Sequence, residues 1–242
     1  MQNLKLPKQW SQISVSQFLE LNRLSSEDGL FNYKIDVLCI LTDKDVSYFE
    51  ELELNELSEL TKQIKWLQSD PSRRYKNNLD KYVLKPFSKL TLGEFIDLEH
   101  YFSNNYLDHF CHILALLYRR TSKNVYGDDI IEPYEYSPRD RLDWFLDYKI
   151  TDVYGLIPEY LKYRENFTNT YTNLLVDVVA DDEVLDDAEE IKEQKREQEK
   201  QKFAWESTIM ALCNDDLSKF NSILDMSVVL VFNILGMKKT LD

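Results

Sequence analysis

Glycine is rare in this chain, and its scarcity restricts the folds that the sequence can adopt. The chain has 5 glycines and 6 prolines in 242 residues, whereas glycine usually makes up about 7% of a protein. A β-sandwich or barrel needs a turn signal every ~8–12 residues, and long helices need far fewer. The sequence therefore predicts an all-α fold.

The composition favours a folded protein and disfavours a nucleic-acid partner. Hydrophobic residues make up 43% of the chain, which excludes disorder along its whole length. The 43 acidic and 29 basic residues give a net charge of −14, which repels a phosphate backbone on average. The densest basic run, residues 73–76, is more typical of a solvated loop or a protein contact. We therefore expect no nucleic-acid partner.

The apolar runs and the cysteines indicate a soluble protein of a reducing compartment. The longest apolar stretch, residues 226–235, is too short to span a membrane and predicts a buried helix. Residues 1–10 lack the apolar run of a signal peptide and are predicted to form an N-terminal arm. Cys39, Cys111 and Cys213 are far apart in apolar helical patterns, so we expect reduced, buried thiols and no disulfide.

The sequence contains a repeated helix start. Residues 13–21 resemble residues 90–98, at an offset of 77. In both segments the apolar residues recur at i, i+3 and i+4, which is typical of an amphipathic helix. Ser14 and Thr91 occupy the same place in the pattern, and their hydroxyls can cap the helix that follows.

The similarity between the two segments extends over two modules. Each helix start is followed by a strongly apolar second helix, and residues 49–57 then match residues 145–153 at an offset of 96. A weaker third copy lies at residues 217–227. We therefore predict helical module 1 at residues 11–70 and helical module 2 at residues 87–167, related by duplication. Chance similarity between amphipathic helices is the alternative.

The rest of the chain is predicted to form an inserted loop and a C-terminal piece. Module 2 is longer than module 1 because of residues 119–138, where Gly127, Pro133 and Pro138 indicate an inserted surface loop. Residues 180–242 are predicted to form a long charged helix and a C-terminal docking piece. The charged helix is either a solvated linker or an arm that docks the end of the chain on a neighbouring protein.

No motif for catalysis or for cofactor binding is found in the sequence. The glycines are isolated, so no phosphate-binding loop is possible, and no nucleophile elbow or paired-cysteine zinc motif occurs. Residues 43–47 have the alternating oxygens of a calcium loop, but Tyr48 and Leu54 stand where the loop needs glycine and an acid. We expect a helix start there, and we predict no catalytic residue and no cofactor.

The three histidines are the remaining candidates for a metal site. His109 and His112 are three residues apart and can share one face of a helix, and His100 lies nearby. A metal site would need a third ligand from His100 or a carboxylate. The alternative is that the rings pack at the edge of the apolar helix at 110–117, and we predict no metal.

Aromatic residues are the best candidates for protein contacts. The chain has 15 Tyr, 12 Phe and 4 Trp, and tyrosine and tryptophan are enriched in protein interfaces. The interface candidates in the inserted loop are Tyr126, Tyr134 and Tyr136, and those in the C-terminal piece are Phe203, Trp205 and Ile209.

The helical pattern resembles small helical proteins of tailed bacteriophages. The segments that carry the resemblance are Trp10, residues 13–21, residues 34–42 with the pattern I-D-x-L-x-I-L-T, and residues 49–52. Both head-to-tail connector or ring proteins and tail assembly chaperones have this pattern. The C-terminal residues 205–223 resemble proteins of the crAss-like phages of gut Bacteroidota.

This resemblance implies a virion structural protein that acts through protein contacts. Its expected partners are copies of itself in a ring and other portal, neck or tail proteins, and its expected location is the virion. The resemblance provides no catalytic residues to transfer. The alternative is a tail assembly chaperone that binds an apolar helix of a tail protein, although the duplicated module departs from a single-module chaperone.

Overall fold

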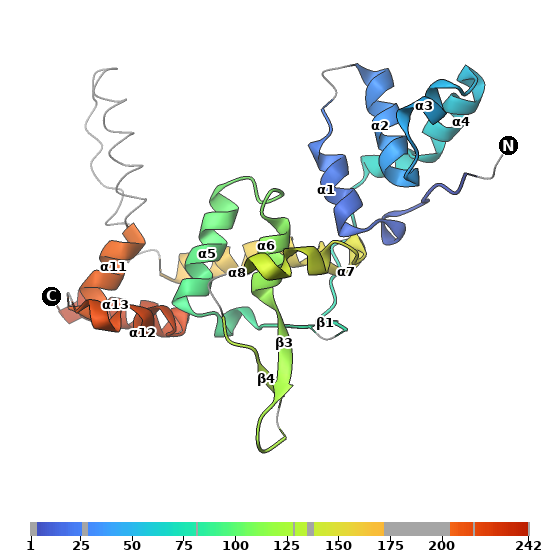
Figure 1. Ribbon diagram of the computed structural model, residues 1–242. Helices are drawn as coiled ribbons and strands as arrows, with labels where there is room; N and C mark the ends of the chain where they lie inside the picture. The colour runs from blue at the N-terminus through green and yellow to red at the C-terminus, as the bar shows by residue number, and fades with distance from the viewer. Residues whose placement is uncertain are drawn as a thin grey trace, which may run out of the picture. The chain divides into compact units, whose positions relative to one another are not determined.

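The fold consists of helices and one small antiparallel sheet (Figure 1). A computed structural model describes residues 4–25, 29–80, 82–127, 129–134, 138–171, 204–214 and 216–241. The predicted charged helix at about 185–210 lies outside these residues up to residue 203, and its last residues, 204–210, are helical. No helix in the described ranges is long and apolar enough to cross a bilayer.

The chain divides into two compact units. Unit 1 comprises Met1–Leu84 and Tyr101–Tyr160, and unit 2 comprises Lys85–His100 and Leu161–Asp242. This division differs from the modules at 11–70 and 87–167, since the start of the second module belongs to unit 2. Duplication of the two modules stays a prediction about the origin of the chain.

Unit 1 contains the sheet and most of the helices. Its α-helices are α1 (Val15–Arg23), α2 (Leu30–Thr42), α3 (Val46–Glu50), α4 (Leu54–Gln63), α6 (Phe110–Leu117), α7 (Ile150–Val153) and the start of α8 (Leu156–Thr170). Its 3-10 helices are η1 (Trp10–Gln12), η2 (Lys65–Gln68) and η4 (Pro138–Phe145). Its strands are β1 (Asn78–Leu79), β2 (Tyr82–Leu84), β3 (Tyr118–Lys123) and β4 (Asp129–Ile131).

Unit 2 is helical in its described part. It is built from η3 (Phe87–Lys89), most of α5 (Leu92–Ser103), the remainder of α8, α11 (Ala204–Cys213), η6 (Leu217–Lys219), α12 (Phe220–Leu224) and α13 (Val228–Leu241). Its core is aromatic. The ring of Phe232 lies 4.9 Å from that of Phe167 and 6.3 Å from that of Phe95.

The predicted helix starts are confirmed at both positions. Ser14 precedes α1, where its hydroxyl accepts the Gln17 N–H and the Gln17 side chain accepts the Ser14 N–H. Thr91 precedes α5, where its N–H donates to the Glu94 carboxylate at 2.8 Å and its hydroxyl accepts the Glu94 N–H at 3.3 Å. Both arrangements are capping boxes, which satisfy amide groups that a helix start otherwise leaves unbonded.

The predicted all-α class is wrong, because a four-stranded antiparallel sheet runs in the order β1-β2-β3-β4. Strands β2 and β3 pair through Val83 with Arg119 and Leu84 with Tyr118. The predicted loop at 119–138 contains most of β3 and all of β4, which form a hairpin. The glycine argument failed because the turn between β1 and β2 places Asp80, with φ of 48°, in the left-handed region, which aspartate tolerates better than most residues.

The core of unit 1 forms around α6. Phe110 and residues 113–117 are all buried there, as expected for a helix that is hydrophobic on every side. Phe18, Phe49 and Phe145 are buried in unit 1, and Phe95, the counterpart of Phe18 in the repeat, is buried in unit 2.

Candidate functional site

The predicted contact residues of the inserted segment lie in different surroundings. Tyr126 is in the loop between β3 and β4 and is 87% exposed, beside Val125, which is 94% exposed. Tyr134 is half-buried, with the Arg119 guanidinium 4.7 Å from its ring centre. Tyr136 lies outside the described residues. Of the two tyrosines that the structure describes, Tyr126 is therefore the one that is open to a partner.

The contact residues predicted in the C-terminal piece lie in α11 where the structure describes them. Ile209 is buried in unit 2. The Trp205 ring is half-buried and lies 5.9 Å from Phe95 and 6.1 Å from Phe232. Both side chains therefore pack within their own unit. Phe203 lies outside the described residues.

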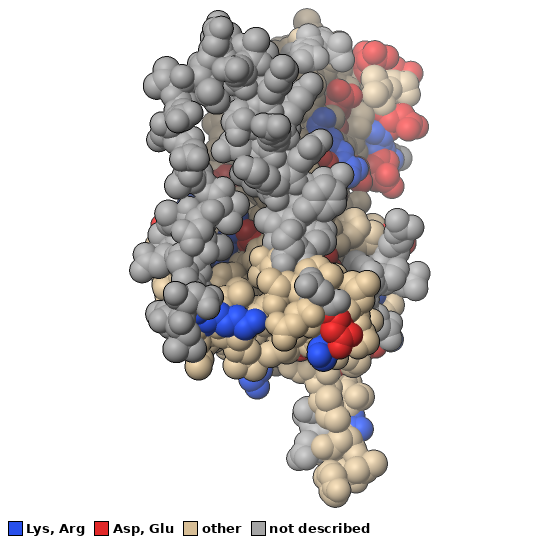
Figure 2. Space-filling model, turned by 90° about the vertical axis from the view of Figure 1, so that its left-hand side faces the viewer, with Lys and Arg blue, Asp and Glu red and all other residues tan. Residues whose placement is uncertain are grey.

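The β3–β4 hairpin presents Tyr126 on an ordered turn. Strand pairs join Thr121 to Ile131 and Ser122 to Ile130. In the loop, the Asn124 side chain accepts the Tyr126 N–H at 2.8 Å. Figures 1 and 2 show the hairpin projecting beyond the rest of its unit. The two exposed side chains are thus held at the end of a projection.

The base of the hairpin is fixed by buried and stacked side chains. Tyr118 and Arg119 are each 1% exposed. The Arg120 guanidinium lies 4.1 Å from the ring centre of Trp144, a cation–π arrangement. These contacts fix the base of the hairpin to the rest of unit 1.

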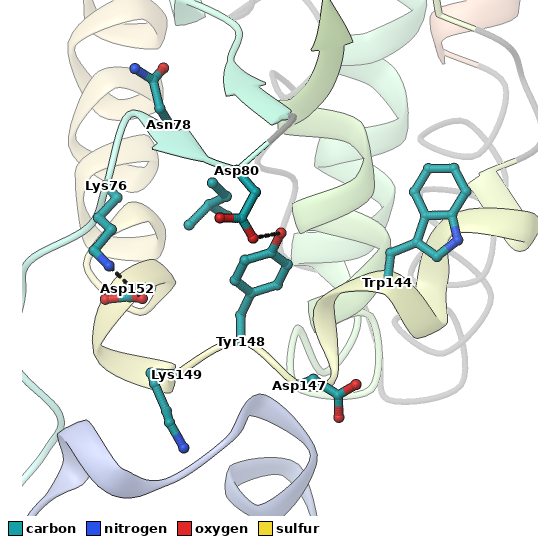
Figure 3. Close-up of a pocket in the computed structure, with 9 residues that line it drawn as sticks. Lys76, Asn78, Asp80, Trp144, Asp147, Tyr148, Lys149 and Asp152 are labelled. Atoms are coloured by element: carbon teal, nitrogen blue, oxygen red, sulfur yellow. Dashed lines mark hydrogen bonds and ion pairs between the residues drawn. The ribbon is translucent and has the colours of Figure 1, made fainter.

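A pocket of about 480 Å³ lies beside the hairpin formed by β1 and β2 (Figure 3). One wall comes from the β1 region and the other from the segment between η4 and α7. The residues that line it are mostly charged or polar, and they are Lys76, Asn78, Leu79, Asp80, Trp144, Asp147, Tyr148, Lys149 and Asp152.

Most charged groups of this pocket are bonded within the protein. Lys76 Nζ lies 2.8 Å from the Asp152 carboxylate, and the Lys76 backbone N–H donates to the Asp152 carbonyl. Tyr148 donates its hydroxyl to Asp80 at 3.1 Å. Lys149 donates its ammonium group to the Gln12 carbonyl. These bonds tie the β1 region and η1 to the segment before α7, so the pocket has a clear structural role.

The electrostatics of Tyr148 agree with this structural role. Burial, together with the hydrogen bond to Asp80, raises the pKa of Tyr148 to about 12. The phenol therefore stays protonated near neutral pH and acts as a hydrogen-bond donor. The sequence alone does not indicate this pocket, because the ion pair between Lys76 and Asp152 joins residues that are 76 positions apart.

A second hollow in unit 1, of about 260 Å³, has aromatic walls. It is lined by Trp10, Phe18, Tyr33, Tyr106 and Tyr154, and Asp70 stands among its other residues. Burial raises the pKa of Tyr106 and of Tyr154, and the Asp70 carboxylate adds to both shifts. The hollow suits an apolar or cationic side chain, because aromatic faces attract both.

The histidines are placed against an aromatic ring. The rings of His109 and His112 each lie 5.2 Å from the ring of Tyr101 and 5.6 Å from each other. Among the described residues, no group of three histidine, cysteine or acidic side chains could hold a metal ion. Burial raises the pKa of the nearby Cys111 to about 11, so its sulfur stays a thiol.

The basic run at 73–76 is partly engaged in the fold. Lys76 pairs with Asp152, and the Arg74 carbonyl accepts the Gly155 N–H at 3.0 Å. Comparison with known proteins adds no further assignment, because no protein-family model, curated protein or solved structure matches the chain.

Proposed function

We propose that this protein is a structural subunit that acts by holding other protein chains, in a connector or tail ring of a tailed phage. The phage assignment rests on the resemblance of the helical pattern. The expected neighbours are copies of the chain and other portal, neck or tail proteins. The observation that best supports a role in assembly is the β3–β4 hairpin, with Val125 and Tyr126 at its tip.

The tip of the hairpin has the properties of a contact site. Two adjacent apolar or aromatic side chains are almost fully exposed there, and the fold gains nothing from them. Tyrosine is enriched among the residues that contribute most to protein binding, since it buries a large area with few rotatable bonds. An ordered turn lowers the conformational entropy that binding would cost.

Replacing Val125 and Tyr126 together with serine is expected to abolish assembly and leave folding intact. Exposed positions usually change stability by less than about 0.5 kcal/mol, whereas loss of a tyrosine that is a binding hot spot costs about 2 kcal/mol or more of binding free energy. Sedimentation of the purified chain and quantitative mass spectrometry of phage particles measure the effect.

The matched control for the hairpin variant is Leu217→Ser, which removes another exposed apolar side chain, 68% exposed, from unit 2. This control is expected to assemble like the unchanged chain. If the hairpin variant enters particles in the normal amount, the hairpin is not the contact and the proposal loses its main support.

The aromatic hollow favours a second candidate, a tail assembly chaperone. Its aromatic walls and single carboxylate would accept side chains of an apolar helix in a tail protein. The two candidates differ in the finished particle. A ring subunit is present in mature virions at a fixed copy number, whereas a chaperone is absent, so mass analysis of purified particles distinguishes them.

A further inference from the structure

One turn occurs three times in the described part of the chain. In each copy a short helix ends, and the carbonyl of a residue at or next to its last position accepts the N–H of the residue three positions later. A new helix begins two residues after the residue that donates this N–H. The bonds are Leu52 N–H to Phe49 O at 3.3 Å, Tyr148 N–H to Phe145 O at 3.2 Å, and Met226 N–H to Ile223 O at 3.1 Å. The helices that follow are α4, α7 and α13, and they begin at Leu54, Ile150 and Val228.

In unit 1 the second of these turns is covered by the start of α1. The Val15 N–H donates to the Tyr148 carbonyl at 2.9 Å, and the Ile150 N–H donates to the Ile13 carbonyl at 3.0 Å. Ser14 and Lys149 form the antiparallel bridge between these two bonds. Ile150 is consequently 0% exposed.

In unit 2 the third turn is covered in the same way by the start of α5. The Leu92 N–H donates to the Met226 carbonyl at 2.8 Å, and the Val228 N–H donates to the Leu90 carbonyl at 3.0 Å. Thr91 forms the antiparallel bridge with Ser227, and Val228 is 0% exposed. The two covering segments share one sequence pattern. It consists of an apolar residue, then Ser or Thr, and then a second apolar residue that begins a capped helix.

The first turn, residues 49–54, has no such cover, and we call it the open turn. Its Leu52 carbonyl and Leu54 N–H correspond to the groups that the other two turns use, and no described residue forms a hydrogen bond with either of them. Leu54 is 78% exposed, whereas its two counterparts are 0% exposed. The open turn connects α3 to α4 at the surface of unit 1 (Figure 1).

The geometry points to a binding site at the open turn for a helix start of another protein. The partner segment would have the sequence apolar–Ser/Thr–apolar and would bind in extended form. Its Ser or Thr would form an antiparallel β-bridge with Glu53, and the segment would cover Leu54. A second copy of the chain has no such start to offer among its described residues, since the starts of α1 and α5 are already bonded within their own units. This inference deepens the proposed function and rests on it, because it names a partner segment of the assembly.

Charge adds a further feature of the partner. Lys149 in the covered turn donates to the carbonyl of Gln12, whereas Glu53 occupies the matching position in the open turn. Glu50 and Glu51 beside it are also exposed. A basic residue two positions before the Ser or Thr would therefore complement the open turn.

The binding site can be tested with a peptide taken from the chain itself. The probe is a fluorescent peptide of residues 9–24, which contains the helix start around Ser14, added to the full chain in an anisotropy titration. Saturable binding is expected, and Leu54→Asp in the protein is expected to weaken it by about tenfold or more. Leu30→Asp is the matched control, because Leu30 also begins a helix of unit 1 and is 64% exposed.

A variant peptide tests the bridge itself. Val15→Pro in the peptide removes the N–H that would donate to the Leu52 carbonyl, while proline is well tolerated at the first position of a helix. This peptide is expected to bind at least about tenfold more weakly. A peptide with Gln12→Lys is expected to bind the unchanged protein more tightly than the original peptide does. For the Glu53→Gln protein, the two peptides are expected to bind with the same affinity.

Three outcomes would overturn the inference. The first is that the peptide does not bind, and the second is that Leu54→Asp leaves its binding unchanged. The third is that the full chain self-associates and that Leu54→Asp abolishes this self-association, because the segment bound at the open turn would then come from a second copy. The titration uses the isolated chain and does not involve the hairpin. Failure of the peptide to bind therefore leaves the hairpin experiment standing, and failure of the hairpin experiment leaves the titration interpretable.

Discussion

Replacing Lys85 with alanine is expected to lower the free energy of unfolding by about 3 kcal/mol or more, because it removes the cation from a buried carboxylate. The Glu94 side chain is fully buried and the Lys85 side chain is 15% exposed. The Lys85 ammonium lies 2.8 Å from Glu94 Oε1. Urea unfolding followed by circular dichroism measures the loss.

The geometry explains why this ion pair matters to the fold of unit 2. The same carboxylate accepts the Thr91 N–H and so caps α5. Thr91 in turn forms the bridge with Ser227 at the start of α13. A buried carboxylate that loses its cation is strongly destabilised, and this weakens the cap.

An exposed pair provides the control for Lys85→Ala. Lys62 and Glu59 lie 2.6 Å apart in α4, but their side chains are 58% and 68% exposed. Lys62→Ala is expected to cost about 0.5 kcal/mol or less, as surface pairs usually do. Equal losses for the two lysine variants would show that burial of Glu94 does not decide the stability of unit 2.

Local signals in the sequence locate the starts of α1 and α5. Ser14 and Thr91 were identified as caps from their position before an amphipathic stripe, and both cap the expected helices. A capping box and its stripe are contained within a few consecutive residues, so sequence alone carries the full signal. The burial of Phe18 and Phe95 follows from the same stripe.

The sequence does not predict the sheet because its strands are short and the turn between β1 and β2 contains no glycine. β1 has two residues and β2 has three, which is too few for an alternating pattern to be recognised. In β3, residues 119–123 are polar or charged, and Arg119 and Arg120 pair with β2, which is distant in the chain. The sequence pattern of residues 119–138 therefore indicated only a surface segment.

The candidate site was predicted in part. Tyr126 was identified from its aromatic character in a surface segment, and the structure places it at the exposed end of the hairpin. Trp205 and Ile209, the candidates of the C-terminal piece, pack within unit 2 instead. An aromatic or aliphatic residue on a helix can face a core or a partner, and only the tertiary contacts decide between them.

The open turn could not be inferred from the sequence either. The match between residues 49–57 and 145–153 indicates that the two segments are related, but it does not indicate that one copy is covered and the other exposed. The cover of the second turn comes from residues 13–15, more than 130 positions away in the chain. Leu54 and Ile150 therefore look equivalent in sequence, although the first is 78% exposed and the second 0%.

Gly155→Ala is expected to lower the free energy of unfolding by about 3 kcal/mol, because two pieces of backbone meet at this glycine. A Cβ atom at residue 155 would lie 2.4 Å from the carbonyl carbon of Arg73 and 2.6 Å from that of Arg74. Neither backbone atom can move aside as a flexible side chain would. Unfolding in urea, followed by tryptophan fluorescence, measures the change.

The added methyl group would also separate hydrogen-bonded segments. The Gly155 N–H donates to the Arg74 carbonyl at 3.0 Å, and the Lys76 N–H donates to the Asp152 carbonyl at 2.8 Å, so residues 74–76 are bonded along the turn between α7 and α8. Gly127→Ala is the matched control, since its Cβ would meet nothing within 4 Å but its φ of 88° disfavours alanine, at a cost of about 1 kcal/mol. If Gly155→Ala lowers the free energy of unfolding by no more than Gly127→Ala does, residues 74–76 and the turn at Gly155 can move apart without penalty. Their close packing would then not contribute to the stability of unit 1.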